Sequence, residues 1–91
     1  GEFDPVTGKI NWPTMLQASE FAQLRSQLDE LFAKRATESS LTIQDFAKID
    51  ETAKLLLAEL KKYIRDVPSN QYIASKEFVK SLAYEVRQPA G

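Results

Sequence analysis

Apolar residues recur at intervals of three and four along most of this chain, which is the spacing of one face of an α-helix. The first such stretch is expected to run from Ser19 to about Ala36, with Glu20 beside the positive end of the helix dipole. Its apolar positions are Phe21, Leu24, Leu28, Leu31 and Phe32. The intervening polar residues are expected in solvent, among them Arg25, Gln27, Asp29, Glu30 and Lys34, with the last two ordered as an i,i+4 ion pair.

A second periodic stretch begins near Thr42, because Asp45 follows three residues later in an arrangement that resembles a capping box. Its main apolar positions are Phe46, Ile49, Ala53, Leu56, Leu60 and Tyr63. The stripe is expected to broaden enough to contact two neighbours through Ile43, Leu57 and Ile64. The pattern therefore predicts the central helix of the fold.

Pro68 interrupts the periodicity, since proline cannot continue a helical hydrogen-bond ladder and disfavours helix at the residue before it. Either Ser69 or Asn70 is a suitable cap for a third helix that ends before Pro89. The predicted apolar side of this helix consists of Tyr72, Ile73, Val79, Leu82 and Val86.

The first eleven residues contain turn formers and no periodicity, so they are expected to form an irregular arm with a tight turn from Pro5 to Gly8. Residues 1–3 have the composition of a cloning remnant. Pro13 is expected to open a short helical turn over residues 14–16, which leaves Trp12 to anchor the arm to the core.

Together these elements predict an all-α fold, a small up-down-up three-helix bundle with an irregular N-terminal arm. Residues 1–11 form the arm, residues 12–88 the bundle and residues 89–91 a C-terminal tail. The chain of 91 residues, 43% of them apolar, suits one domain with one modest core. The alternative architecture is a helical hairpin that dimerises.

The residue types that carry most recognisable chemistry are missing. The chain has no His and no Cys, and it has no Gly between Gly8 and Gly91. Pairs such as Ser75 and Lys76 are adjacent on a helix, so their side chains do not face each other as nucleophile and base. We therefore predict no enzyme activity, no catalytic residue, no cofactor and no metal site.

Charge narrows the class of partner. Twelve Lys and Arg residues oppose 13 Asp and Glu residues, for a formal net charge of −1, which disfavours nucleic acid and anionic membranes. No apolar run is long enough to span a bilayer, so a soluble protein is predicted, either cytoplasmic or exported. The alternative is weak binding of nucleic acid or another anionic ligand by a basic patch of Lys61, Lys62 and Arg65, joined by Lys76 and Lys80.

Aromatic residues are numerous for so small a core, and tyrosine at a partly hydrated edge is common in interfaces. The leading hypothesis is therefore a structural or protein-interaction domain of a larger protein, with a protein as partner. The candidate interaction surface combines aromatic and basic side chains at helical spacing: Tyr72, Lys76, Lys80 and Tyr84. A monomer is favoured, and a homodimer is the alternative.

Two phrases of the sequence, Ile10-Asn11-Trp12-Pro13 and Tyr72-Ile73-Ala74-Ser75-Lys76-Glu77-Phe78, the latter continued by Ser81 to Glu85, resemble uncharacterised helical segments of planctomycete proteins. The resemblance covers residues 4–89. It implies a helical fold and brings no activity, cofactor or binding residue with it.

Overall fold

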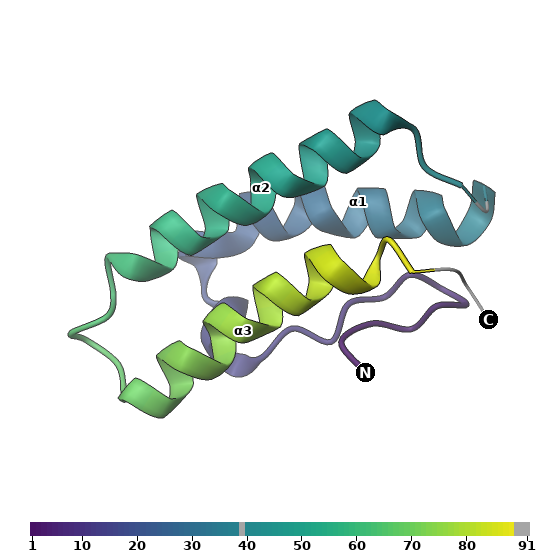
Figure 1. Ribbon diagram of the computed structural model, residues 1–91. Coiled ribbons are helices and arrows are strands. Elements are labelled where there is room, and N and C mark those ends of the chain that lie inside the picture. Colours follow the sequence, from purple (N-terminus) through teal and green to yellow (C-terminus); the bar gives the residue numbers. More distant parts are fainter. Residues whose placement is uncertain (39, 89–91) are drawn as a thin grey trace.

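The computed structural model describes residues 1–38 and 40–88, so the predicted tail of residues 89–91 lies outside the described part. Two short 3-10 helices, η1 (Thr14–Gln17) and η2 (Ser19–Phe21), precede three long helices, α1 (Ala22–Glu38), α2 (Ile43–Lys61) and α3 (Ser69–Glu85). Successive long helices run in opposite directions (Figure 1). The predicted all-α, up-down-up three-helix bundle is confirmed.

The core is built from the inward faces of all three helices and from the N-terminal segment. Its buried apolar residues are Ile10, Leu16, Phe21, Leu28, Leu31, Phe32, Ile49, Ala53, Leu56, Leu60, Val79, Leu82 and Val86. Three residues assigned to apolar helix faces are largely in solvent instead: Ile43 is 87% exposed, Ile64 48% and Ile73 53%. Ile43 starts α2 and Ile64 follows its end, so both lie where the neighbouring helices no longer cover the stripe.

The capping residue of α2 was predicted correctly, whereas that of α3 was not. Thr42 caps α2 as predicted: its hydroxyl accepts from the Asp45 backbone N–H, and the Asp45 carboxylate accepts from the Thr42 N–H. The prediction that Ser69 or Asn70 caps α3 was wrong, because Ser69 is already helical. Pro68 takes the cap position, and its carbonyl accepts from the N–H groups of Gln71 and Tyr72.

The N-terminal arm folds back on itself before it reaches the bundle. Phe3 and Ile10 form an isolated antiparallel bridge, and the Gly8 N–H donates to the Asp4 carbonyl at 2.7 Å, which closes the expected turn. Gly8 has φ +78°, and a Cβ placed there would lie 2.3 Å from the Phe32 carbonyl oxygen. Glycine is thus required both by the left-handed backbone and by the close approach to α1.

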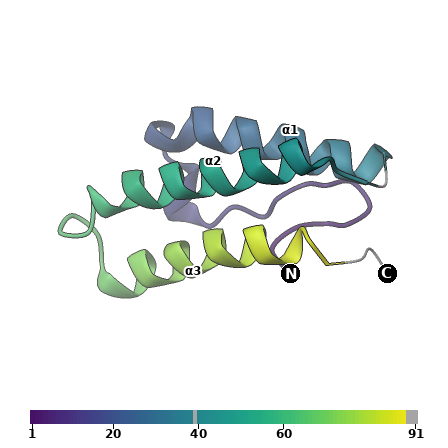
Figure 2. The same ribbon diagram turned by 45° about the horizontal axis from the view of Figure 1, so that its top comes forward.

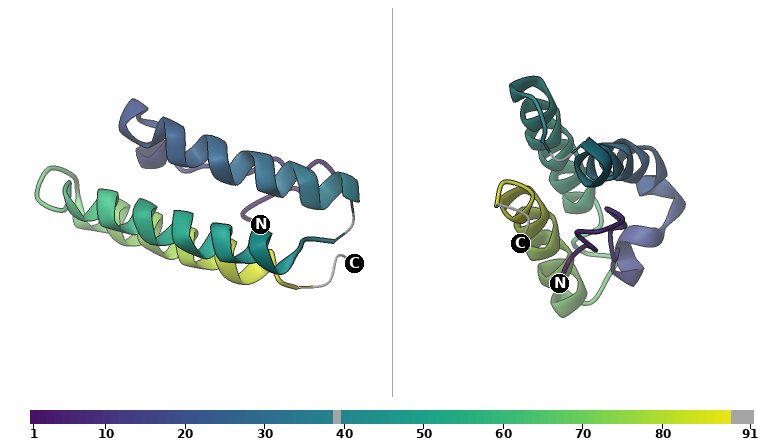
Figure 3. Two further views of the ribbon diagram at one scale, coloured as in Figure 1. Left: turned by 90° about the horizontal axis from the view of Figure 1, so that it is seen from above. Right: turned by 90° about the vertical axis from the view of Figure 1, so that its right-hand side faces the viewer.

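Aromatic contacts attach this segment to the groove between α1 and α3. The Phe3 ring meets the Phe32 ring edge-on at 4.9 Å between centroids. Trp12 donates its indole N–H to Asp29 of α1 at 3.0 Å and packs at 5.7 Å against Phe78 of α3. The anchoring role predicted for Trp12 is confirmed, and Figures 2 and 3 show the N-terminal segment passing between the two helices.

Several α1 side chains expected to be merely solvated hold tertiary contacts. Arg25 donates to the carbonyls of Leu16 and Ala18, both at 2.6 Å, and thereby fixes the turn between η1 and η2. Gln27 accepts from the buried Thr52 hydroxyl of α2 at 3.3 Å. The expected pairing of Lys34 with Glu30 was wrong, because the Lys34 ammonium lies 2.8 Å from the Asp45 carboxylate across the α1–α2 turn.

Candidate interaction surface between α2 and α3

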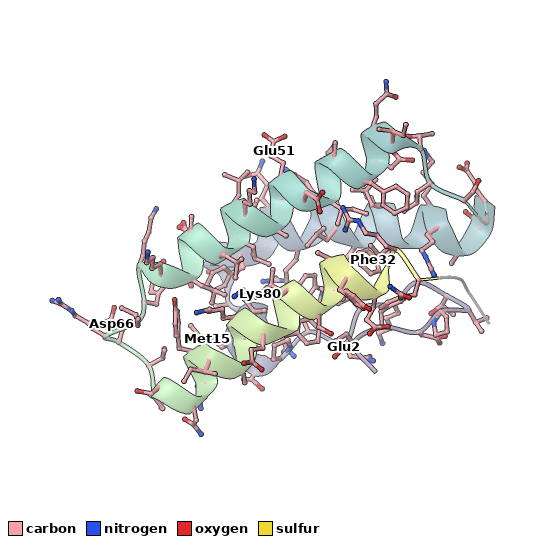
Figure 4. The ribbon with its side chains drawn as sticks, viewed as in Figure 1. Glu2, Met15, Phe32, Glu51, Asp66 and Lys80 are labelled. Carbon is pink, nitrogen blue, oxygen red and sulfur yellow. The ribbon has the colours of Figure 1, made fainter. Side chains whose placement is uncertain are left out.

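An open hollow of about 380 Å³ lies on the surface where α2 and α3 pack together. Its lining comes from the second half of α2 and the first two-thirds of α3, and consists of Leu57, Ala58, Lys61, Tyr72, Lys76 and Lys80. We call this feature the α2–α3 hollow. Figure 4 labels Lys80 on α3, and Figure 1 shows how closely the two helices run beside each other.

Helical spacing explains why these residues meet. Tyr72, Lys76 and Lys80 are each four positions apart, so they form one continuous row along α3. Leu57 and Lys61 form the corresponding row on α2, again four positions apart, and α2 and α3 are antiparallel neighbours. Ala58 stands beside Leu57, and its short side chain leaves the space open.

The hollow has an apolar floor and a positive rim. Leu57 and Tyr72 are half-buried and pack against the core, so only part of each side chain faces the hollow. The rim carries three ammonium groups, from Lys61, Lys76 and Lys80, and no carboxylate is among the described residues that line it. Its charge is therefore of one sign over an apolar base.

The structure brings together only part of each predicted surface. Tyr72, Lys76 and Lys80 of the candidate aromatic and basic face line the hollow, whereas Tyr84 does not and is 62% exposed one turn further along α3. The four-residue spacing turns progressively around the helix, by about 40° at each step, which carries Tyr84 away from α2.

The alternative basic patch is also divided. Lys61 lines the hollow, but Lys62 points its ammonium at Glu59, 3.1 Å from the carboxylate, and Arg65 lies in the turn after α2 without lining the hollow. Sequence reasoning missed Leu57 and Ala58 as parts of the surface. The signal for Leu57 was present, since its position at the edge of the α2 stripe placed it beside a neighbouring helix.

Among residues 1–38 and 40–88, no group of three or more carboxylates is close enough together to hold a metal ion. Within that described part, none of the helices combines the length and apolar character needed to cross a bilayer.

No family model, no curated protein and no solved structure matches this chain. The resemblance to planctomycete segments stays a prediction.

Proposed function

We propose that this chain is a non-catalytic protein-interaction domain and that the α2–α3 hollow is its contact surface. The observation that carries the proposal is the hollow itself, in which an apolar floor from two helices is ringed by lysines from both. Binding clefts commonly combine an apolar base with a few convergent polar groups. The absence of His and Cys from the sequence supports the non-catalytic part, because these residues supply most nucleophiles and proton carriers active at neutral pH.

Selection of a displayed library of random peptides for binding to the purified domain tests this function without assuming the chemistry of the partner. The decisive variant is Ala58→Glu, which places a larger, charged side chain on the floor of the hollow. Ala58 is an exposed helical position and glutamate is a good helix former, so the fold is expected to stay within about 0.5 kcal/mol of wild type. The matched control is Ala47→Glu, at another exposed position of α2 outside the hollow.

Peptides recovered on the wild-type domain are expected to bind Ala58→Glu at least about tenfold more weakly, a loss of about 1.4 kcal/mol. They are expected to bind Ala47→Glu with nearly unchanged affinity. Equal binding to both variants would place the contact elsewhere, and a selection that enriches no peptide would remove the proposed function.

Oligomeric state bears on the same surface, because self-association through the hollow would occupy it. We propose a monomer, and sedimentation equilibrium is expected to give a mass of one chain at every concentration. A concentration-dependent dimer that Ala58→Glu dissociates would make self-association the function of this surface.

The alternative partner is a nucleic acid or another polyanion, which the lysines of the rim would also attract. Phosphate contacts give affinities that fall steeply as salt rises, whereas an apolar contact persists. Binding of an arbitrary oligonucleotide whose affinity falls steeply as salt rises would favour the alternative. Retained peptide binding at high salt would favour the protein-interaction domain.

A further inference from the structure

The charges around the α2–α3 hollow allow the partner to be described more closely. We infer that the hollow binds an acidic peptide segment in which carboxylates flank one large apolar side chain. This inference rests on the function proposed above, and it adds the chemistry of the ligand.

The three lysines that line the hollow lack an internal partner, unlike several other basic residues of the molecule. Arg35 donates to the carbonyls of Val86 and Gln88, Arg87 binds the Asp50 carboxylate at 2.6 Å, and Lys34 pairs with Asp45. In the described part of the chain, none of the three lysines of the rim lies within ion-pair distance of a carboxylate. Lys48 and Lys54 also form no ion pair within the described residues, so what distinguishes the rim is that three such lysines line one hollow beside apolar side chains.

Helix dipoles account for only one of these lysines. Lys61 occupies the last turn of α2, where a cation interacts favourably with the carboxyl end of the dipole. Lys76 and Lys80 lie in the interior of α3, and no basic residue falls in its last turn. The two lysines repel each other as like charges at i,i+4, and Glu77, three positions before Lys80, offsets part of this cost. An anionic ligand would reverse the sign of that contribution, and local costs of this kind are typical of functional sites.

The floor of the hollow indicates what accompanies the charge. Leu57, Ala58 and the Tyr72 ring offer apolar contact, and the volume of about 380 Å³ lies near the lower end of ligand clefts, enough for one large side chain. A nucleic-acid groove instead follows the backbone with an extended positive track. Three lysines on a chain of net charge −1 do not form such a track.

Helix geometry sets the spacing of the acidic groups. Lys76 and Lys80 are separated by about 6 Å along the helix axis, from a rise of about 1.5 Å per residue. Carboxylates one turn apart on a helical peptide match this spacing, as do carboxylates two residues apart in an extended peptide, at about 6.8 Å. Lys61 on the opposite wall would meet a carboxylate on the other side of the apolar side chain.

The probe for this inference is a fluorescent synthetic peptide of about 12 residues, about 18 Å long as a helix, with Asp and Glu around one central Phe. Two matched peptides dissect it: one replaces Phe by Ser, and the other replaces every carboxylate by its amide. Fluorescence anisotropy gives the affinities, and amide shift changes in ¹⁵N NMR spectra locate the contact.

The protein variant is Lys76→Glu/Lys80→Glu, which reverses the charge of the α3 wall. Its control is Lys48→Glu/Lys54→Glu, which makes the same change of net charge at exposed positions of α2 outside the hollow. Thermal melts of both variants verify folding before affinities are compared.

The acidic peptide is expected to bind wild type, to lose at least about tenfold in affinity for Lys76→Glu/Lys80→Glu and to lose less than about threefold for the control. The peptide with Ser in place of Phe and the peptide with amides in place of carboxylates are each expected to bind wild type at least about fivefold more weakly than the acidic peptide does. Equal losses for the two variants, or binding that does not need Phe, would overturn the inference in favour of general attraction for polyanions.

The two proposals fail in different ways. If display yields peptides that depend on Ala58 but are neutral or basic, and the acidic probe does not bind, the ligand chemistry is wrong and the interaction domain stands. If neither displayed peptides nor the acidic probe depends on Ala58, the proposed function falls and the inference falls with it.

Discussion

Helix α3 meets the rest of the molecule in two different ways. On the side toward α1, the chain's own N-terminal segment fills the groove with Trp12 and the completely buried Leu16. On the side toward α2, the helices pack directly and leave a hollow on the surface with a lysine rim. Figure 3 shows the N-terminal segment on the first side only.

The difference lies in whether polar groups are satisfied within the chain. In the filled groove the Trp12 indole reaches Asp29, and Arg25 satisfies the carbonyls of Leu16 and Ala18. At the α2–α3 hollow the lysine ammonium groups of the rim have no carboxylate partner in the described residues. The filled groove therefore serves stability, whereas the hollow contributes three lysines that form no ion pair within the described residues.

The largest effect is expected from Leu16→Ala, in the filled groove. Truncation of a fully buried leucine removes its transfer free energy and leaves a cavity, for a loss of about 2–5 kcal/mol. The matched change on the open surface of α3 is Ile73→Ala, expected to cost less than about 0.5 kcal/mol because Ile73 is largely exposed. Urea unfolding followed by circular dichroism measures both, and similar losses would erase the distinction between the two sides.

Gly8→Ala is expected to have the second-largest effect, a loss of about 1–3 kcal/mol in the free energy of unfolding. Alanine is strained at positive φ, and its Cβ would collide with the α1 backbone. Val6→Ala in the same turn is the control, since Val6 is exposed and its loss should be within about 0.5 kcal/mol. Faster amide exchange at Asp4 and Asn11, whose N–H groups donate to the Lys9 and Glu2 carbonyls, would show in Gly8→Ala that the arm has opened. An unchanged melting temperature would mean that the arm contributes little to the core.

Lys76→Gln probes the open side and should act in the opposite direction. Lys76 has a like charge, Lys80, at i,i+4 and no carboxylate three or four positions away, so its removal is expected to stabilise the free domain by about 0.2–0.5 kcal/mol at low salt, with the gain vanishing as salt rises. Lys54→Gln on α2 is the control, because Lys54 follows Asp50 and Glu51 on its helix and its removal loses attraction. A destabilised Lys76→Gln domain would reveal a structural partner for Lys76 and contradict the absence of a counter-charge at the rim.

The smallest effect is expected at the Lys34–Asp45 pair, which shows what a carboxylate does for a lysine in this fold. The hydrogen bond from Lys34, followed by that from the Thr42 backbone, lowers the pKa of Asp45 below its ordinary value of about 3.9. A carboxylate with a lowered pKa contributes stability that is present above that ordinary value and is lost as pH falls through the folded-state pKa.

The acid limb of the stability curve should therefore change in Asp45→Asn. Wild type is expected to be the more stable at pH 6, and the difference in melting temperature should shrink as pH falls below about 4. At the alkaline end, the same pair raises the pKa of Lys34, so its contribution is complete below about 10.4 and declines as pH rises through the raised value. A difference in melting temperature that stays constant from pH 6 to pH 2 would contradict this assignment.

Local sequence rules were sufficient for most of the fold. Apolar periodicity located three helices, Thr42 and Asp45 marked the start of α2, and Pro68 marked the break before α3. These features depend on residues within a few positions of one another, so they can be recognised without the tertiary structure.

The same rules failed where a distant element decides burial. Ser75, 1% exposed, is buried on α3 beside Pro13, Thr14 and Met15, whereas Ile73 faces solvent. The periodic pattern favoured Ile73 because it considers only hydrophobicity and spacing, not the position of η1. Only part of the candidate surface was predicted, for a related reason. The sequence spacing indicated the row on α3, but Leu57 and Ala58 join that row only because α2 packs beside α3.

By itself, the sequence determined the helical class and the approximate helix bounds, because these follow from local spacing and residue type. Only the tertiary structure decided that the arm fills the α1–α3 groove, that Lys34 pairs with Asp45 and that Lys61 joins Lys76 and Lys80 around one hollow. The physical reason is that burial and ion pairing depend on which helix faces pack against each other. That packing depends on residues that are far apart in the sequence.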